Sequence, residues 1–222
     1  MTTISFREDP HTFQYTTGNR SRNPPLNILI HGYHNTDQDA LDSYNNIEKN
    51  LDRQCLGLFW PGEKLFIKFP TALRNAVFTG WRFNDYLHSL DPLILQQMTI
   101  QTHSAGALVA CEALNGDIKV GHLILSAPAI PEDSFKKRYF NVLSNVKRID
   151  IAFSANDSVL ANDYPLGVFD PLQIFSGKAM GRYGSSVMAD NLFNHDFSTL
   201  VTSHGGYKNC AQYYDTCFRV DF

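Results

Sequence analysis

The chain has 222 residues and a mass of 25.1 kDa, which suits one domain with a large hydrophobic core rather than a disulfide-dependent mini-protein. A hydrophobic fraction of 43% and a charged fraction of 18% exclude a disordered chain. The net charge is −3 and no basic block is present, so we expect no nucleic-acid partner.

Apolar runs and helical spacings alternate along the first third of the sequence. The predicted elements there are two short edge strands at 4–6 and 12–15, a buried strand at 26–30, a helix at 37–52 and a second strand at 55–60. Thr36 is the expected N-cap of this helix, because acidic residues follow it in the first turn and apolar residues recur behind them.

The alternation continues along the rest of the chain. The predicted elements are a helix at 71–90, a strand at 98–103, a helix at 105–114, strands at 120–125 and 146–153, a last strand at 193–201 and a last helix at 207–218. The possible core positions of the helix at 71–90 are Leu73, Val77, Trp81, Leu87 and Leu90.

Strands that alternate with helices predict an α/β fold, in which helices cover both faces of a mostly parallel sheet. We expect residues 1–222 to form one such domain. The stretch 126–145 has room for one helix, which is too little for a large cap domain, and any lid would come from 61–70 or 160–190. Ligands of such folds bind at the carboxyl ends of the strands.

The segment Thr102-His-Ser-Ala-Gly106 lies between a predicted strand and a predicted helix. A tight strand–serine–helix turn lifts the hydroxyl above the sheet beside a helix N-terminus, and small residues at 105 and 106 let helix and strand approach closely. Ser104 is therefore the candidate nucleophile. An ordinary helix N-cap is the other interpretation of this serine.

A serine hydroxyl needs a base, and the base needs an acid that orients it. In this architecture the three residues follow in the order Ser, acid, His. Asp157 comes after the predicted strand at 146–153, and His204 comes after the predicted strand at 193–201. One cleft at the strand ends could therefore collect both residues beside Ser104.

Three other residues compete for the roles of acid and base. Asp150 lies inside a predicted strand, where its side chain would point into a face of the sheet, and Asp163 lies farther along the loop. His195 lies within the predicted last strand. Asp157 and His204 are preferred because both lie beyond a strand and a Gly-Gly pair follows the histidine.

The tetrahedral intermediate of acyl transfer needs hydrogen-bond donors for its oxyanion. One is expected from the backbone N–H of Ala105, directly after the nucleophile. The second is expected from the backbone N–H of Tyr33, since Gly32 lets the chain turn sharply after the strand at 26–30. An ordinary strand-ending turn is the other interpretation of His31-Gly32.

These motifs together resemble the α/β-hydrolase superfamily, and most closely a bacterial group of largely uncharacterised hydrolases with H-G-Y-N-T, W-P-S and H-S-x-G motifs. The corresponding segments here are His31-Gly-Tyr-His-Asn-Thr36, Trp60-Pro-Gly62 and His103-Ser-Ala-Gly106. The departures are His34 as an insertion, Gly62 in place of Ser, and Thr102 at the usual small position of the elbow. The resemblance implies Ser104 as nucleophile, Asp157 as acid and His204 as base.

The residues and the resemblance predict a serine hydrolase that cleaves carboxylic esters through an acyl-enzyme. Its partner would be a small-molecule or lipid-like ester, and the reaction requires no cofactor. A thioesterase or acyltransferase with the same triad, or a non-catalytic binding protein on a hydrolase scaffold, are the alternatives. A metal site is not expected, because His31 and His34 have no third ligand nearby in the sequence.

Aromatic residues make up 13% of the chain. Trp60, Phe175 and Tyr183 fall in predicted loops near the carboxyl ends of the strands, where aromatic rings would favour an apolar acyl or alcohol group. These three are the predicted pocket residues, with ordinary packing as the other interpretation.

No stretch of 18 apolar residues is present and the first residues lack the features of a signal peptide, so we expect a cytoplasmic protein without a transmembrane segment. The four cysteines form no C-x-x-C pair, which favours reduced thiols. Delivery elsewhere and the oligomeric state stay open.

Overall fold

The structure, a computed structural model, describes residues 1–7, 14–17, 26–62, 69–162, 164 and 177–219. Its centre is an eight-stranded sheet in the order β2-β1-β4-β3-β5-β6-β7-β8. Every neighbouring pair of strands is parallel except β1 with β2, which is antiparallel. This is the mostly parallel α/β sheet that the sequence predicts.

The strands are β1 (Thr2–Ser5), β2 (Gln14–Thr17), β3 (Asn27–Ile30), β4 (Cys55–Phe59), β5 (Thr99–His103), β6 (Val120–Ser126), β7 (Val146–Phe153) and β8 (Leu192–Asp196). The helices are α1 (Asp37–Leu51), α2 (Phe69–His88), α3 (Pro92–Leu95), α4 (Gly106–Leu114), α5 (Ser134–Lys137), α6 (Phe140–Asn145), α7 (Ser158–Asn162), α8 (Met180–Tyr183), the 3-10 helix η3 (Gly206–Asn209) and α9 (Ala211–Cys217).

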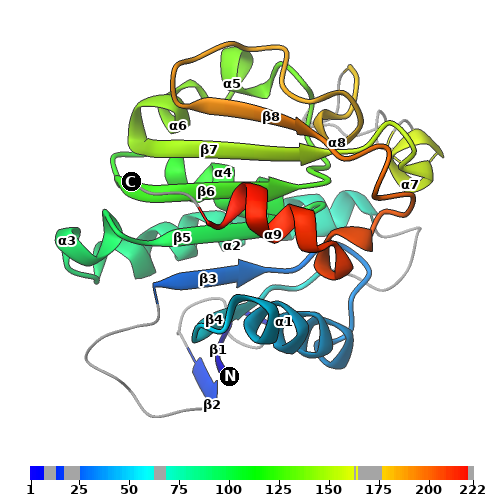
Figure 1. Cartoon of the computed structure of the whole chain (residues 1–222). Helices are drawn as coiled ribbons and strands as arrows, with labels where there is room; N and C mark the ends of the chain where they lie inside the picture. The colour runs from blue at the N-terminus through cyan, green and yellow to red at the C-terminus, as the bar shows by residue number, and fades with distance from the viewer. Residues whose placement is uncertain (8–13, 18–25, 63–68, 163, 165–176, 220–222) are drawn as a thin grey trace.

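Helices cover both faces of the sheet (Figure 1). In that view α1 and α9 lie in front of the strands, whereas α2 and α4 lie behind them, and the arrowheads of β3 and of β5 to β8 point the same way. The carboxyl ends of these parallel strands therefore gather along one edge of the sheet, where an α/β fold binds its ligands.

The first helix begins as predicted, at an N-cap made by Thr36. Its hydroxyl accepts the backbone N–H of Asp39 at 3.0 Å, and the Asp39 carboxylate accepts the backbone N–H of Thr36 at 2.9 Å. This capping box satisfies two N–H groups that a helix end leaves without partners. Because the cap fixes where α1 begins, it also fixes the length of the loop between β3 and this helix.

The helix that follows β5 is buried along nearly its whole length. Every residue of α4 except Glu112 is buried, because the sheet covers one side and α2 covers the other. At Gly80 of α2 an added Cβ would come within 2.4 Å of the Cβ of Glu112 and 2.9 Å of the carbonyl oxygen of Val109. The close crossing of the two helices holds α4, and so the turn before it, against the sheet.

Five details of the sequence-based elements are wrong. The strand expected at 4–6 as an edge strand is β1, which lies between β2 and β4. Trp81 is 54% exposed and contacts Phe78 edge-on instead of entering the core. The last strand ends at Asp196, because Phe197 begins a turn whose carbonyl accepts the N–H groups of Leu200 and Val201. The last helix is divided into η3 and α9, and the stretch 126–145 holds two short helices, α5 and α6, where one was expected.

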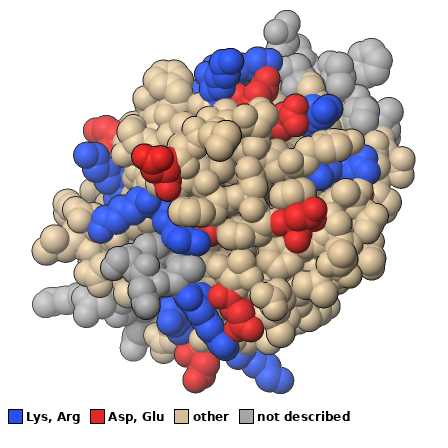
Figure 2. All heavy atoms as spheres, turned by 45° about the horizontal axis from the view of Figure 1, so that its top comes forward, with Lys and Arg blue, Asp and Glu red and all other residues tan. Residues whose placement is uncertain are grey.

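On the face shown in Figure 2, basic and acidic side chains lie among one another rather than in separate patches. None of the helices in the described part of the chain is long and apolar enough to cross a membrane. All four cysteines are free thiols.

Candidate active site

Ser104 occupies the turn between β5 and α4 in a backbone conformation that is unusual for a residue with a side chain. Its φ of 55° lies in the left-handed region, which costs about 1–3 kcal/mol for a non-glycine residue. Three backbone hydrogen bonds hold it there: its N–H donates to Ser126, and its carbonyl accepts from Ala107 and Ala129, all at 3.0–3.1 Å. Strain of this kind is what a strand–nucleophile–helix turn requires.

Two glycines let the loop after β3 lie against this turn. An added Cβ on Gly106 would be 2.6 Å from the carbonyl oxygen of His31, and one on Gly32 would be 2.8 Å from the Cβ of Ser104. Real Cβ atoms do not approach backbone or Cβ atoms that closely, so only glycine fits both positions. Thr102 does not crowd the junction, since its hydroxyl points to β6 and donates to the Ile124 carbonyl at 3.5 Å.

Asp157 and His204 are in contact at the carboxyl ends of the strands. Asp157 is buried just after β7, and its Oδ2 lies 2.7 Å from Nδ1 of His204 while its Oδ1 accepts the N–H of Leu160 at 3.0 Å. A carboxylate only accepts, so Nδ1 carries the proton and Nε2 of the neutral imidazole is left able to take one.

The described residues include no hydrogen bond between the Ser104 hydroxyl and His204. The two are nevertheless linked through His103, which precedes the serine and whose ring centroid lies 4.7 Å from that of His204. In many hydrolases the contact between nucleophile and base tightens only when substrate binds.

Ala105 presents its backbone N–H at the start of α4. It is buried with φ −67° and ψ −13°, and within the part of the chain that the structure describes its N–H donates no hydrogen bond. A buried N–H at a helix N-terminus, next to a serine, is positioned to bind an anion. Tyr33, the other expected donor, directly follows Gly32 in the loop that touches Ser104.

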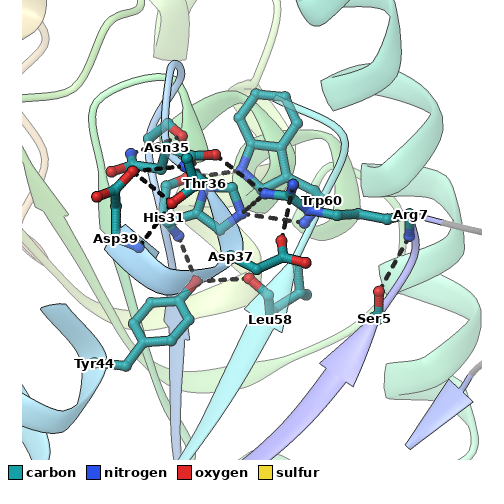
Figure 3. Close-up of polar contacts among 11 residues, drawn as sticks. Ser5, Arg7, His31, Asn35, Thr36, Asp37, Asp39, Tyr44, Leu58 and Trp60 are labelled. Carbon is teal, nitrogen blue, oxygen red and sulfur yellow. Dashed lines mark hydrogen bonds and ion pairs between the residues drawn. The ribbon is translucent and has the colours of Figure 1, made fainter. Parts of the chain in front are cut away.

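His31 and Trp60 hold that loop together from behind (Figure 3). Nε2 of His31 accepts the backbone N–H of Trp60 at 3.2 Å, Nδ1 donates to the Gly32 carbonyl at 2.8 Å, and the Trp60 indole N–H donates to the His31 carbonyl at 2.7 Å. The rings stack at 5.5 Å. Burial lowers the pKa of His31 to about 3, so the imidazole stays neutral and this pattern of donors and acceptors is fixed.

Arg7, which follows β1, ties the same loop to the start of α1. Its guanidinium forms an ion pair with Asp37 at 2.8 Å and donates to the Asn35 carbonyl at 3.3 Å (Figure 3). No local sequence pattern marks Arg7 for this contact, because about thirty residues separate it from its partners.

The competing residues Asp150 and His195 form a separate cluster that spans β6, β7 and the edge strand β8. Asp150 Oδ1 lies 2.6 Å from Nε2 of His195, Oδ2 lies 2.6 Å from Nε2 of His122, and Arg148 donates to both oxygens at 2.7 and 2.9 Å. Burial alone would raise the pKa of Asp150, but these hydrogen bonds hold it well below its usual range. Asp163 lies outside the described residues.

The sequence from residue 16 to residue 166 matches the model of a family described as alpha/beta hydrolase of unknown function (DUF900). This match spans more than half of the chain. The chain belongs to this α/β-hydrolase family. A search of curated proteins finds no match.

Several solved structures are similar to this one. An esterase from Pyrococcus furiosus is 11% identical over 88% of this chain and 84% of its own, with a TM-score of 0.44. An acetyl xylan esterase from Paenibacillus sp. R4 is 12% identical over 86% of this chain and 72% of its own, with a TM-score of 0.45. Esterase B from Lactobacillus rhamnosis is 11% identical over 92% of this chain and 75% of its own, with a TM-score of 0.44.

The three predicted pocket residues of this α/β hydrolase lie in different surroundings. Trp60 is completely buried behind His31, so it contacts the loop rather than open space. Tyr183 in α8 is 48% exposed, with the cationic ends of Lys178 and Arg182 each within 5.4 Å of its ring. Phe175 lies outside the described residues.

A cavity of about 120 Å³ lies on the α1 side of the sheet, behind the site. Its walls include Gly32 and Gly205 from the strand-end loops, His103 at the end of β5, and polar side chains such as Gln101 and Lys208. Ser104, Asp157 and His204 do not line it. The cavity therefore borders the residues that flank the serine and the histidine.

Proposed function

We propose that this α/β hydrolase cleaves carboxylic esters, with Ser104 as nucleophile, His204 as general base and Asp157 as the acid that orients the base. The observation that carries the proposal is the 2.7 Å hydrogen bond between His204 Nδ1 and Asp157 Oδ2 at the strand ends where Ser104 adopts its left-handed conformation. The order of the three residues along the chain is the order that this fold uses.

In the first half of the reaction the Ser104 oxygen attacks the ester carbonyl while Nε2 of His204 takes the hydroxyl proton. The carbonyl oxygen becomes an oxyanion, which the N–H groups of Ala105 and Tyr33 would stabilise. The tetrahedral intermediate collapses, the C–O bond to the alcohol breaks, and His204 returns its proton to the leaving alkoxide. An acyl group then remains on the serine.

In the second half, His204 takes a proton from water and the resulting hydroxide attacks the acyl carbon. The bond to the Ser104 oxygen breaks and the serine recovers its proton from His204, which releases the carboxylic acid. Asp157 keeps the His204 ring oriented, and its carboxylate stabilises the imidazolium that forms twice in each cycle. The expected substrate is a small-molecule or lipid-like ester.

The test is covalent labelling of the intact protein with a fluorophosphonate, followed by mapping of the adduct. The adduct should be found on Ser104 and should be absent in Ser104→Ala, which should also lose hydrolysis of p-nitrophenyl butyrate. The matched control is Ser126→Ala. Ser126 is buried and pairs with His103 in the neighbouring strand, so we expect no label on Ser126 itself and normal labelling of Ser104 in this variant. Undiminished labelling of Ser104→Ala would contradict the assignment.

Substrate panels distinguish hydrolysis from mere binding. A folded wild-type protein that turns over no p-nitrophenyl ester, from acetyl to decanoyl, and that takes up no fluorophosphonate would contradict the proposed function. If the enzyme instead hydrolyses esters of some acyl lengths and not of others, the longest acyl group that it accepts indicates the size of the acyl pocket.

A further inference from the structure

We infer that His103 is a positioning residue for the same reaction, because its imidazole anchors the main chain of the base to the residue before the nucleophile. This inference rests on the proposed function. His103 takes no part in the proton transfers of the proposed reaction, since it neither gives a proton to the substrate nor takes one from it.

The anchor is a hydrogen bond of 2.8 Å between Nε2 of His103 and the backbone carbonyl oxygen of His204. It joins residues that are 101 positions apart in the sequence. The base is therefore held at two points, its ring by Asp157 and its main chain by His103. Because Ser104 is the next residue after His103, the second bond sets the base relative to the nucleophile more directly than the first.

The direction of this bond is fixed by chemistry. A carbonyl oxygen only accepts, so Nε2 of His103 must carry the proton. Burial, together with the nearby charge that His204 can carry, lowers the pKa of His103 to about 3. The ring therefore stays a neutral donor at any pH at which the enzyme would be assayed, and it adds no positive charge beside the imidazolium formed during catalysis.

Gly205 and Gly206 follow the histidine, and a Cβ added to Gly205 would meet nothing within 4 Å. The next fixed points are the Gly206 N–H, which donates to the Ser203 carbonyl at 3.0 Å, and the buried side chain of Tyr207. Before the histidine, the nearest bond from another element is the one in which the hydroxyl of Ser154 donates to the Val201 carbonyl at 2.6 Å. The bond from His103 acts between these points, on the carbonyl group of the histidine itself.

The cavity behind the site makes the hydrogen bond more important for the orientation of the ring. His103 lines this cavity, so packing does not enclose the imidazole on that side. A side chain of similar size without a donor would fit there but would leave the His204 carbonyl without its partner. The resulting displacement of the base need be no more than about 1 Å to slow the chemical step by about a hundredfold.

The experiment compares His103→Leu with His103→Gln, using p-nitrophenyl butyrate as substrate. Leucine removes the donor, whereas the glutamine side chain carries an amide N–H at a similar reach. We expect His103→Leu to lower kcat by about 10- to 100-fold with KM within about threefold of wild type, and His103→Gln to recover most of the loss.

His122→Leu is the matched control for a general loss of stability. His122 is a buried histidine in the next strand whose Nε2 also makes a hydrogen bond, but it pairs with Thr99 at the opposite end of β5 from His103. This variant should unfold at a lower temperature and keep its kcat per folded molecule. If His103→Leu fails to fold, His103→Asn replaces it, since the shorter amide cannot reach the His204 carbonyl.

Three outcomes would overturn the role of His103: a donor-less variant with the kcat of wild type, a loss confined to KM, or a glutamine variant as slow as leucine. Each would mean that the hydrogen bond does not position the base. Failure of the proposed function looks different, because the wild-type enzyme would then hydrolyse no ester and Ser104→Ala would change nothing.

Discussion

Replacing Asp150 by Asn should destabilise this fold strongly while leaving its shape unchanged. Asp150 is completely buried in β7 and accepts four hydrogen bonds from three side chains, those of His122, Arg148 and His195. An asparagine has nearly the same volume, but one of its two terminal groups donates instead of accepting. At least one N–H of a neighbour would then face another donor, and Arg148 would lose its counter-charge.

The size of the effect follows from the exposure of these partners. Removing one member of a buried ion pair costs about 3–5 kcal/mol. The side chains of Arg148 and His195 are 23% and 21% exposed, so water can replace part of what they lose. We therefore expect a loss near the lower limit, about 3 kcal/mol. In a chain of this length that corresponds to a fall in Tm of about 6–12 °C.

Thermal unfolding followed by circular dichroism at pH 7 measures this fall. Asp133→Asn is the matched control, because Asp133 forms an i,i+4 pair with the exposed Lys137. Such a surface pair contributes about 0.5 kcal/mol or less, so its Tm should change by less than about 2 °C. A change equally small in Asp150→Asn would refute the argument that the charge of Asp150 holds these three strands together.

Two further effects follow from close contacts and from burial. Gly106→Ala should lower the free energy of unfolding by about 1–3 kcal/mol, because the new Cβ would lie 2.6 Å from the His31 carbonyl oxygen. Gly205→Ala is the control and should change it by no more than about 0.5 kcal/mol. Equal urea midpoints for the two variants would contradict this. Stability should also fall from pH 7 to pH 5. His31 and His103 have pKa values of about 3 in the folded chain and near 6.5 in the unfolded chain. As the pH falls over this range, the unfolded chain binds more protons than the folded chain, and the free energy of unfolding decreases. Each can contribute up to about 1.4 kcal/mol per pH unit, and a urea midpoint that stays constant over this range would be inconsistent with neutral buried rings.

The buried strands were predictable because central parallel strands are apolar on both faces. All seven residues of β6 are buried, and β7 has the bounds predicted from the sequence, 146–153. Trp81 shows where the pattern stops being informative. Helical spacing selects a face of α2, but how much of that face is covered depends on where α4 crosses, and the crossing at Gly80 leaves Trp81 in solvent.

Long-range polar contacts at the site were not predictable for a different reason. The bonds from Arg7 to Asp37 and from His103 to His204 join segments that only the folded chain brings together. A guanidinium and an imidazole have many possible partners, so residue type alone selects none of them. Positions at strand ends are more informative, because parallel strands bring all their carboxyl ends to one edge.

This fold contains two Asp–His pairs, Asp150 with His195 and Asp157 with His204. Comparing them shows how far the order of residues along the chain can assign a candidate acid and base. Ser104, Asp150 and His195 follow one another in the same order as Ser104, Asp157 and His204, and both pairs are 2.6–2.7 Å apart. What differs is the place along β7. The side chain of a residue within a strand points into a face of the sheet, so Asp150 meets side chains of the neighbouring strands and its charge is neutralised by Arg148. A residue past the end is free to turn toward the loops, where Asp157 meets His204, the proposed base. Order along the chain therefore favours one of the two aspartates as the candidate acid only when it is combined with the position relative to the end of the strand.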